Sequence, residues 1–509
     1  MRIKKIFNLF GFALSANKVR RSQNEVEKLL AQQALAKILA GIQGISLEKA
    51  ELFLDIDDSI DPALVEAIEP FPLTQMLPVL EQALGQSAKK VFKRIDEAVA
   101  VASLGQVHFA VLKNGQEVAV KIRYPHIADA INTELSLLEL SSDIEAVKPW
   151  DVEGYKTELK NNMLRELDYL SEADRQQYFA EKVSVEGLST PFIYKQLCSE
   201  RVLVQTRAKG VLINQITNWS QQDREAVGCI LLSTLLTGLF IAGEVHGDPD
   251  ADNILFDHDE SGMPVVNLLD YGCTIPVSES RRLLLLQLII ASRNQSAINP
   301  LDCFVALGFD VDKLAHISGS LPVLCQFLFE PFLVDHSFQI GGWNLETKIT
   351  ELLGDKRCWF LSAIPSDLVL LTRAFRGLIQ QLKQLQVNVN CWDILQQSAG
   401  DRLMEQAIKI TLPDNITQNV TTNISFADQA EKLCVLVSKN GRMTASITMS
   451  ADAVLDLENI MPESVTELLR KNKAIDLNQI EENLKANGLV PQTIFDFDNG
   501  EKNYKVWLE

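Results

Sequence analysis

The sequence lacks a surplus of positive charge. Its formal net charge at pH 7 is −19 over 509 residues, whereas a nucleic-acid-binding surface needs clustered lysine and arginine to neutralise phosphates. The acidic balance argues against nucleic acid as a partner. The start of the chain is an exception, because six basic residues, interleaved with aliphatic and phenylalanine side chains, precede the first acidic residue, Glu25. Residues 1–21 are expected to contact an anionic membrane surface peripherally or to form a solvated helix.

Close cysteine pairs are also missing, and only one apolar run is long enough to raise the question of a membrane span. The eight cysteines are scattered, which excludes a Cys-x-x-Cys zinc or redox motif and indicates a reducing compartment. One uncharged stretch, residues 226–243, reaches the length of a membrane span. It runs directly into the polar motif described next, so we expect a buried helix there. We therefore predict a cytoplasmic protein that is at most peripheral to a membrane.

Carboxylates and an amide follow two neighbouring apolar segments. Asp248 and Asn253 lie five residues apart, and Asp270-Tyr271-Gly272 closes the next apolar segment. In protein kinases this spacing belongs to the catalytic loop and to the metal-binding Asp-Phe-Gly. One aspartate orients the nucleophile there, while the asparagine and the second aspartate hold Mg²⁺.

A candidate nucleotide-binding half precedes these residues. Val118-Ala-Val-Lys121 predicts a buried strand that ends in a phosphate-binding lysine. Asn114-Gly115 predicts a hairpin turn before it. Where a kinase carries a glycine-rich loop, residues 98–106 contain one glycine, Gly105. The alanines carry Cβ atoms that limit the approach of the backbone to phosphates, so a stiffer loop is expected.

Together these motifs resemble the UbiB/AarF family of atypical, protein-kinase-like proteins, which is associated with ubiquinone biosynthesis and lipid metabolism. The family's alanine-rich motif is similar to residues 100–108, and its catalytic loop to residues 246–253. Its Glu-x-Asp motif is similar to residues 166–168. The similarity covers roughly residues 85 to 390.

The resemblance implies a role for each of these residues. Asp248 would orient the attacking hydroxyl or water, Lys121 paired with Glu172 would hold the phosphates, and Mg²⁺ would be bound by Asn253 and Asp270. The residues implied to bind the nucleotide, ATP or ADP, are Ala100, Ala102, Ser103, Gly105, Gln106, Lys121, Glu166 and Asp168. The family's Lys-x-Gly-Gln motif, thought to restrict protein substrates, has no counterpart in residues 39–52.

The predicted fold class is α+β, a protein-kinase-like two-lobed fold. We expect a helical N-terminal extension over 1–84, a small lobe over 85–205, a large lobe over 206–412 and an accessory α+β unit over 413–509. One helix over about 155–182 would carry Glu166, Asp168 and Glu172, with Glu166 pointing away from the other two. In the C-terminal unit, Asn440-Gly441 predicts a hairpin, and two helices are expected near 464–471 and 477–487.

Three functions remain open from the sequence. The first is a Mg²⁺-dependent ATPase or small-molecule or lipid kinase that supports ubiquinone or isoprenoid-lipid metabolism. The second is a nucleotide-binding regulator or scaffold with little turnover. The third and weakest is a protein kinase, because no Ala-Pro-Glu segment follows Gly272 to shape a peptide platform. A calcium loop starting at Asp248 is disfavoured, since Asn253 stands where its turn requires glycine.

Overall fold

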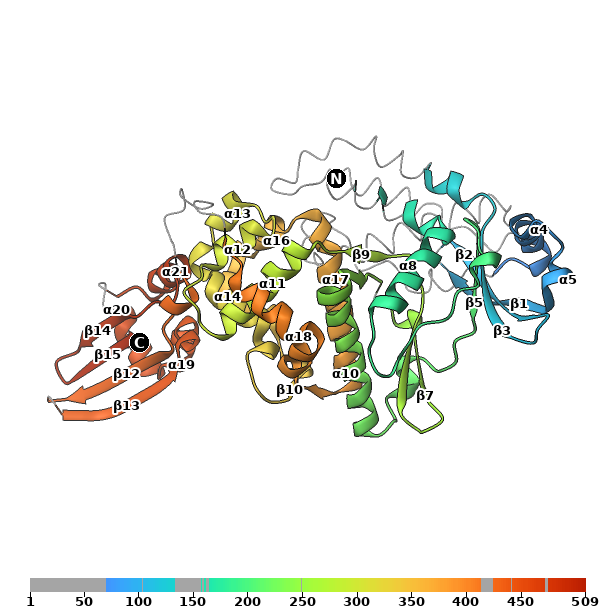
Figure 1. Ribbon diagram of the computed structural model, residues 1–509. Helices are drawn as coiled ribbons and strands as arrows, with labels where there is room; N and C mark the ends of the chain where they lie inside the picture. The colour runs from blue at the N-terminus through green and yellow to red at the C-terminus, as the bar shows by residue number, and fades with distance from the viewer. Residues whose placement is uncertain are drawn as a thin grey trace, which may run out of the picture. The chain divides into compact units, whose positions relative to one another are not determined.

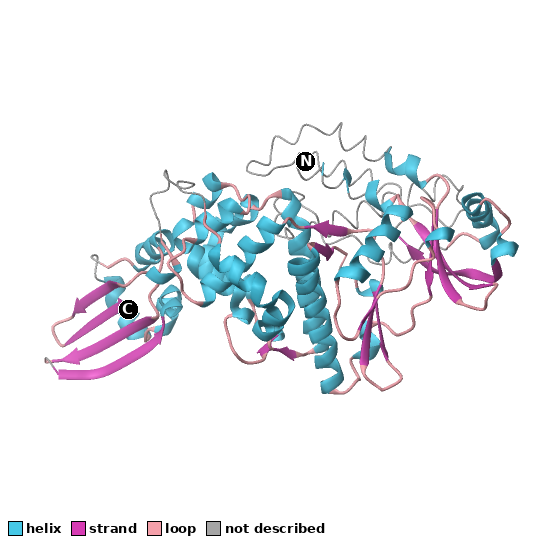
Figure 2. Cartoon of the chain, viewed as in Figure 1, coloured by secondary structure: helices cyan, strands magenta, loops and turns pink. Residues whose placement is uncertain are grey.

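The computed structural model describes residues 70–102, 104–132, 157, 160–161, 164–248, 250–412, 424–440, 442–471 and 475–509. Figures 1 and 2 show helices and strands mixed along the chain. The chain divides into two compact units. Unit 1 contains residues 1–277 and 366–388, and unit 2 contains residues 278–365 and 389–509.

Unit 1 begins with an antiparallel four-stranded sheet of order β1-β2-β3-β5. Along β2 buried and partly buried positions alternate, and β3 is buried almost throughout because it lies in the middle of the sheet. Aliphatic side chains of α4 and of these strands form one hydrophobic core. The elements are α4 (Leu73–Leu84), α5 (Ala88–Val91), β1 (Phe92–Ala102), β2 (Gly105–Leu112), β3 (Glu117–Arg123), α8 (Tyr169–Lys182) and β5 (Val202–Thr206).

The expected hairpin is present, and Gly115 adopts the positive φ of 91° that its turn requires. The alanine-rich segment differs from the expected loop. Ala98–Ala102 is the end of β1 and pairs with β2, with Ala102 opposite Gly105. Valine favours an extended strand, whereas alanine does not, so the pairing with β2 holds this segment extended as far as Ala102, and Leu104 lies in the turn.

The remainder of unit 1 places the polar motifs on short strands. Strand β6 pairs with β9, β7 pairs with β8, and β4 joins β8. The helices α10 and α17 lie side by side. The elements are β4 (Leu188–Ser189), α9 (Ile213–Ile216), α10 (Gln221–Thr237), η3 (Gly238–Ala242), β6 (Glu244–His246), η4 (Ala251–Asn253), β7 (Ile254–His258), β8 (Pro264–Leu268), β9 (Thr274–Pro276) and α17 (Ser366–Leu385).

Helix α10 continues into the π-helical turn η3 and ends at Gly243, which has a positive φ of 71°. Within the described residues, the continuous helix Gln221–Ala242 is apolar and long enough to cross a membrane. A second candidate exists only if Arg357–Ala363 and Asp367–Leu385 are taken as one bent span. In the first helix 61% of the apolar window is buried inside the protein, as expected for a core helix.

Unit 2 combines helices with a second antiparallel sheet of order β13-β12-β15-β14. Leucine and phenylalanine side chains from the helices after residue 278 and from this sheet form one core. The elements are α11 (Glu279–Arg293), α12 (Pro300–Ala306), α13 (Val311–Ala315), α14 (Leu321–Phe329), β10 (Phe338–Gln339), α15 (Leu345–Leu353), α16 (Arg357–Ala363), α18 (Cys391–Lys409), β12 (Lys432–Lys439), β13 (Arg442–Ser450), α19 (Leu457–Ile460), α20 (Glu463–Lys471), α21 (Leu477–Asn487), β14 (Gln492–Asp498) and β15 (Lys502–Leu508). Strand β11 (Asn388–Val389) stands where the chain returns to unit 2.

The hairpin and the two helices predicted for the C-terminal region are present as β12–β13, α20 and α21. The second hairpin, β14–β15, was not predicted. The structure's two units divide the chain at points other than the predicted domain boundaries, and the C-terminal sheet shares a core with helices from before residue 365. The division into two kinase lobes therefore stays a prediction.

Candidate nucleotide site

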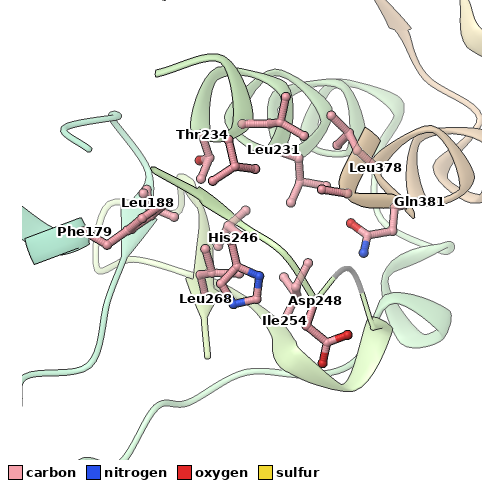
Figure 3. Close-up of a pocket in the computed structure, with 14 residues that line it drawn as sticks. Phe179, Leu188, Leu231, Thr234, His246, Asp248, Ile254, Leu268, Leu378 and Gln381 are labelled. Atoms are coloured by element: carbon pink, nitrogen blue, oxygen red, sulfur yellow. The ribbon is translucent and has the colours of Figure 1, made fainter. Parts of the chain in front are cut away.

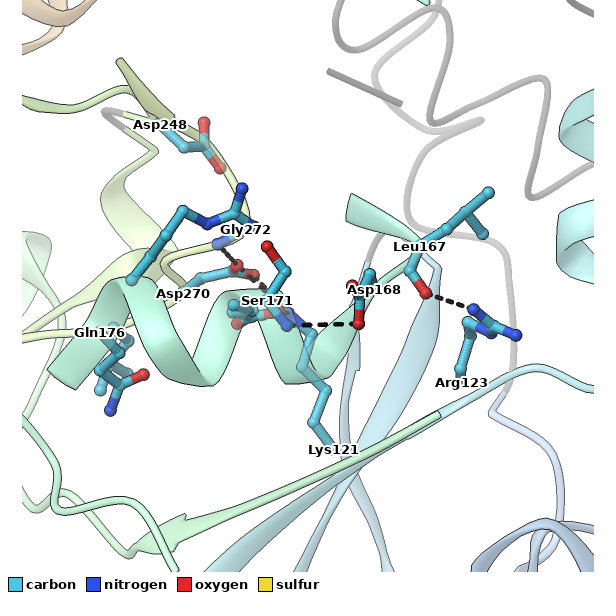
Figure 4. A network of polar contacts seen from close by, with 12 residues as sticks. Lys121, Arg123, Leu167, Asp168, Ser171, Gln176, Asp248, Asp270 and Gly272 are labelled. Carbon is cyan, nitrogen blue, oxygen red and sulfur yellow. Dashed lines mark hydrogen bonds and ion pairs between the residues drawn. The ribbon is translucent and has the colours of Figure 1, made fainter. Parts of the chain in front are cut away.

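Lys121 lies at the centre of a buried ion-pair network. Strand β3 carries it between β2 and β5, where it pairs with Val107 and Leu203. Its Nζ donates to both carboxylate oxygens of Glu172 at 3.0 Å, and to those of Asp270 at 3.1 and 3.2 Å. Figure 4 shows this network around Lys121 and Asp270. The pairing with Glu172 that the resemblance implied is present, and Asp270 is a second partner.

Helix α8 begins later than the sequence indicated. Asp168 is its N-cap, and its carboxylate accepts hydrogen bonds from the amides of Leu170 and Ser171. The expected continuous helix over 155–182 is therefore wrong at this point, because the helical residues 164–166 end before the cap. As a result Glu166 faces the same pocket as Glu172, contrary to the prediction that it points elsewhere.

The pairing of β6 with β9 brings the remaining motifs together. His246 on β6 is opposite Thr274 on β9, which sets the catalytic-loop region beside the Asp-Tyr-Gly segment. His246 Nε2 bonds to the carbonyl oxygens of Leu269 and Asp270 at 2.9 and 2.8 Å, so this nitrogen carries the proton and donates. Asp270 has a positive φ of 58°, unusual for a residue other than glycine.

Asp248 is held by two donors. Asn253 Nδ2 donates to one carboxylate oxygen at 2.7 Å, and Arg373 Nη2 donates to the other at 2.8 Å. Arg373 comes from α17, 125 residues further along the chain. No local motif marks this arginine, so sequence reasoning missed it.

The residues that line one narrow polar pocket are Leu104, Lys121, Glu166, Tyr169, Glu172, Asp248, Asp270, Gly272 and Cys273. Other predicted residues do not line it. Gln106 is buried and bonds to the backbone of Phe71 and to His108. Ala100 is exposed on β1, Ala102 is partly exposed, and Ser103 lies outside the described residues. Gly105 lies beside the pocket, and the Asn253 amide is directed to Asp248.

Carboxylates outnumber cations in this pocket. Burial, with the charges of Asp270 and Asp248, raises the pKa of Glu166 to about 8. Burial also raises the pKa of Glu172, with Lys121 opposing. For Asp270, burial favours the neutral form, but Lys121 and the Gly272 amide outweigh it and lower the pKa.

This surplus of negative charge fits a divalent cation. Among the described residues, however, no group of three or more histidine, cysteine or acidic side chains is arranged to hold a metal by itself. That agrees with Mg²⁺ chemistry, because Mg²⁺ is typically bound by one or two protein carboxylates together with the phosphates of a nucleotide. Asp270 and the Asn253 amide oxygen are the donors that suit such an ion.

Cys273 is poorly suited to act as a nucleophile. Its thiol is buried, and burial with neighbouring carboxylates raises its pKa to about 12. The acidic residues that resembled a calcium loop instead accept hydrogen bonds within their own turns. Asp250 caps η4, and Asp259 accepts three bonds from Ser261 and Met263 within its own turn.

A second, mostly apolar cavity lies beneath the catalytic-loop region, between α10 and α17. Figure 3 shows Leu231 and Thr234 of α10 and Leu378 and Gln381 of α17 around His246 and Asp248. Asp248 lines both this cavity and the polar pocket.

Comparison with known families gives a match for part of the chain. The ABC1 atypical kinase-like domain matches residues 63–299. Residues 63–299 belong to the UbiB/AarF family of atypical kinase-like proteins.

Similar family members come from several kingdoms. The mitochondrial atypical kinase COQ8B of Rattus norvegicus is 27% identical over 391 residues, covering 72% of this chain and 71% of that protein. The mitochondrial atypical kinase COQ8 of Saccharomyces cerevisiae is 24% identical over 374 residues, covering 69% and 72%. The chloroplastic ACTIVITY OF BC1 COMPLEX KINASE 8 of Arabidopsis thaliana is 30% identical over 257 residues, covering 48% of this chain but only 33% of that protein.

A solved structure supports the family's fold for this chain. The complex of Rv3197 with erythromycin, from Mycobacterium tuberculosis, has a TM-score of 0.51 and 22% identity. The match covers 74% of this chain and all of that one. The α+β kinase-like class predicted from the motifs agrees with the matched ABC1 domain and with the mixed helices and strands, and the likeness to the solved structure is one of fold alone.

Proposed function

We propose that this chain is a Mg²⁺-dependent, ATP-binding atypical kinase-like protein that acts as an ATPase or as a kinase for a small molecule or lipid. The observation that carries the proposal is the convergence of Lys121, Asp270 and Asp248 on one pocket. These residues come from three separate segments, and each suits a different task in phosphoryl transfer.

The residues divide these tasks as follows. Lys121 binds the phosphates, and Glu172 holds its ammonium in place. Asp270 and Asn253 would hold Mg²⁺, which would supply positive charge beside the phosphates. Asp248 orients the hydroxyl or water that attacks. Because Lys121 contacts both oxygens of Asp270, nucleotide and metal must loosen this ion pair when they bind.

The proposed acceptor is a small molecule or lipid in ubiquinone or isoprenoid-lipid metabolism. Family membership supports this choice, as does the short path from Gly272 through β9 to α11, which leaves no room for a long peptide-binding segment. Contact with a membrane through residues 1–21 belongs to the same proposal, and these residues lie outside the described part of the chain.

One observation favours a second function, a nucleotide-binding regulator with little turnover. Both carboxylate oxygens of Asp248 already accept a strong hydrogen bond. A carboxylate engaged in this way has fewer lone pairs open to a substrate hydroxyl. Slow turnover, or none, is the expected sign of this function.

The deciding experiment is phosphate release from ATP by the purified protein with Mg²⁺, with and without anionic liposomes. The test variant is Asp270→Asn, and the matched control is Asp174→Asn, an exposed aspartate of α8 outside the pocket. We expect Asp270→Asn to lower turnover at least about 100-fold and Asp174→Asn to leave it unchanged.

Each other outcome has a defined meaning. Stimulation by liposomes supports a membrane-associated substrate. A nucleotide-dependent rise in melting temperature without turnover selects the regulator. Neither turnover nor a nucleotide-dependent shift refutes the proposed nucleotide site.

A further inference from the structure

The polar pocket is lined by a buried tyrosine whose hydroxyl has no hydrogen-bond partner among the described residues. Tyr169 is the first residue of α8, lines the pocket and is 1% exposed. Within the described part of the chain its Oη has no hydrogen-bond partner. Buried polar atoms in native proteins are almost always paired, so an unpaired one beside a pocket indicates a ligand.

The hydroxyl lies close to the tip of the β1–β2 hairpin. A Cβ atom built on Gly105 would stand 2.7 Å from Tyr169 Oη and 2.3 Å from the carbonyl oxygen of Ile122. Glycine is therefore required at position 105 for space. The tyrosine ring also lies 4.8 Å from Lys121 Nζ, measured to the ring centroid. The hydroxyl thus lies beside the hairpin tip, and the ring that carries it lies beside Lys121.

The chemistry of this hydroxyl suits a phosphate. Burial raises the pKa of Tyr169 above its ordinary value, with Lys121 opposing, so the group remains a neutral donor. Phosphate oxygens only accept hydrogen bonds at neutral pH. In a glycine-rich loop, backbone amides would donate to them, but here Ala100 to Ala102 belong to the edge strand β1 and pair with β2. Amides that point into this ladder are not open to a phosphate, and a side-chain donor beneath the hairpin can supply a hydrogen bond in their place.

We propose that Tyr169 is a nucleotide-binding residue whose hydroxyl donates a hydrogen bond to a phosphate oxygen of the nucleotide held by Lys121. This inference rests on the proposed function and adds a residue that neither the motifs nor the ion-pair network identified.

Tyr169→Phe tests the proposal, with Tyr178→Phe as a matched control on the same helix. Tyr178 lies outside the pocket, and its hydroxyl donates to the carbonyl oxygen of Ala242 at 2.8 Å. The full-length variants are compared by melting temperature without ligand and by calorimetric titration with Mg²⁺–ADP and with adenosine.

The two variants should show opposite patterns. We expect Tyr169→Phe to weaken Mg²⁺–ADP binding by about 10-fold, to leave adenosine binding unchanged and to melt no lower than wild type. Tyr178→Phe should melt at a lower temperature and bind Mg²⁺–ADP as wild type does.

Equal Mg²⁺–ADP affinity for Tyr169→Phe and wild type overturns the inference while the proposed function stands. An equal loss for adenosine and Mg²⁺–ADP also overturns it, because the hydroxyl would then contact the nucleoside. If wild type binds no nucleotide at all, the proposed function itself fails.

Discussion

Glu166 lies among several charged side chains that its place in the Glu-x-Asp motif does not reveal. Three carboxylates, those of Asp270, Asp248 and Glu172, disfavour its ionisation, and Lys121 favours it. Together with burial they raise its pKa from the ordinary 4.5 to about 8. At neutral pH this carboxyl is therefore mostly protonated in the folded, ligand-free protein.

A pH dependence of stability follows from this shift. Between pH 4.5 and 8 the folded protein holds a proton on Glu166 that the unfolded chain has released, so stability falls as the pH rises through this range. Glu166→Gln removes the contribution. In EDTA and without nucleotide, we expect the melting temperature of the variant to gain on wild type by about 2–4 °C between pH 5 and pH 8.5. Parallel profiles for the two proteins would show that Glu166 ionises normally.

Helix α17 contributes the side chain of Arg373 to the site. It belongs to unit 1, although the chain on both sides of it, before residue 366 and after residue 388, belongs to unit 2. Arg373 of this helix holds Asp248, and it lies beyond the end of the matched family domain at residue 299. Asp248, the proposed catalytic aspartate, is thus held by an element outside the matched residues 63–299.

Arg373→Met should separate turnover from binding. The side chains of Arg373 and Asp248 are only 14% and 20% exposed, and the loss of this charged hydrogen bond should cost about 1.5–3 kcal/mol of stability. We expect turnover to fall at least 10-fold, because Asp248 loses a group that positions it. Nucleotide affinity should change less than 2-fold, because Arg373 does not line the polar pocket. The control is Lys383→Met, an exposed cation of the same helix. Unchanged turnover in Arg373→Met would show that Asn253 alone positions Asp248.

The elements that the sequence predicted well are those with local signals. Asn114-Gly115 and the apolar strand before Lys121 were sufficient for the β2–β3 hairpin. The break before α8 was missed because the residues around Asp168 are compatible with a helix, and only the capping bonds to Leu170 and Ser171 show where it starts. The contact between Arg373 and Asp248 has no local signal, since it depends on how distant helices pack.

At the scale of the whole molecule, too, local signals were predicted correctly and long-range packing was not. The residues after 413 were predicted to form an accessory unit because their hairpin signals differ from the helical pattern before them. In the structure their apolar side chains complete the core of unit 2. Leu433, Phe497 and Leu508 share one cluster with Leu314 and Leu324 of the preceding helices. Composition shows a change of secondary structure, but it does not show where a core ends.

Leu508→Ala tests whether this core is cooperative. Leu508 on β15 is 2% exposed and pairs with Leu433 of β12. The truncation should cost about 2–5 kcal/mol. Because the core is shared, hydrogen exchange should accelerate in α14 as well as in β12. Ile447→Ala, at a half-exposed position on β13 of the same sheet, should have little effect on either. If α14 keeps its protection while the C-terminal sheet alone loosens, residues 413–509 form the separate unit that the sequence predicted.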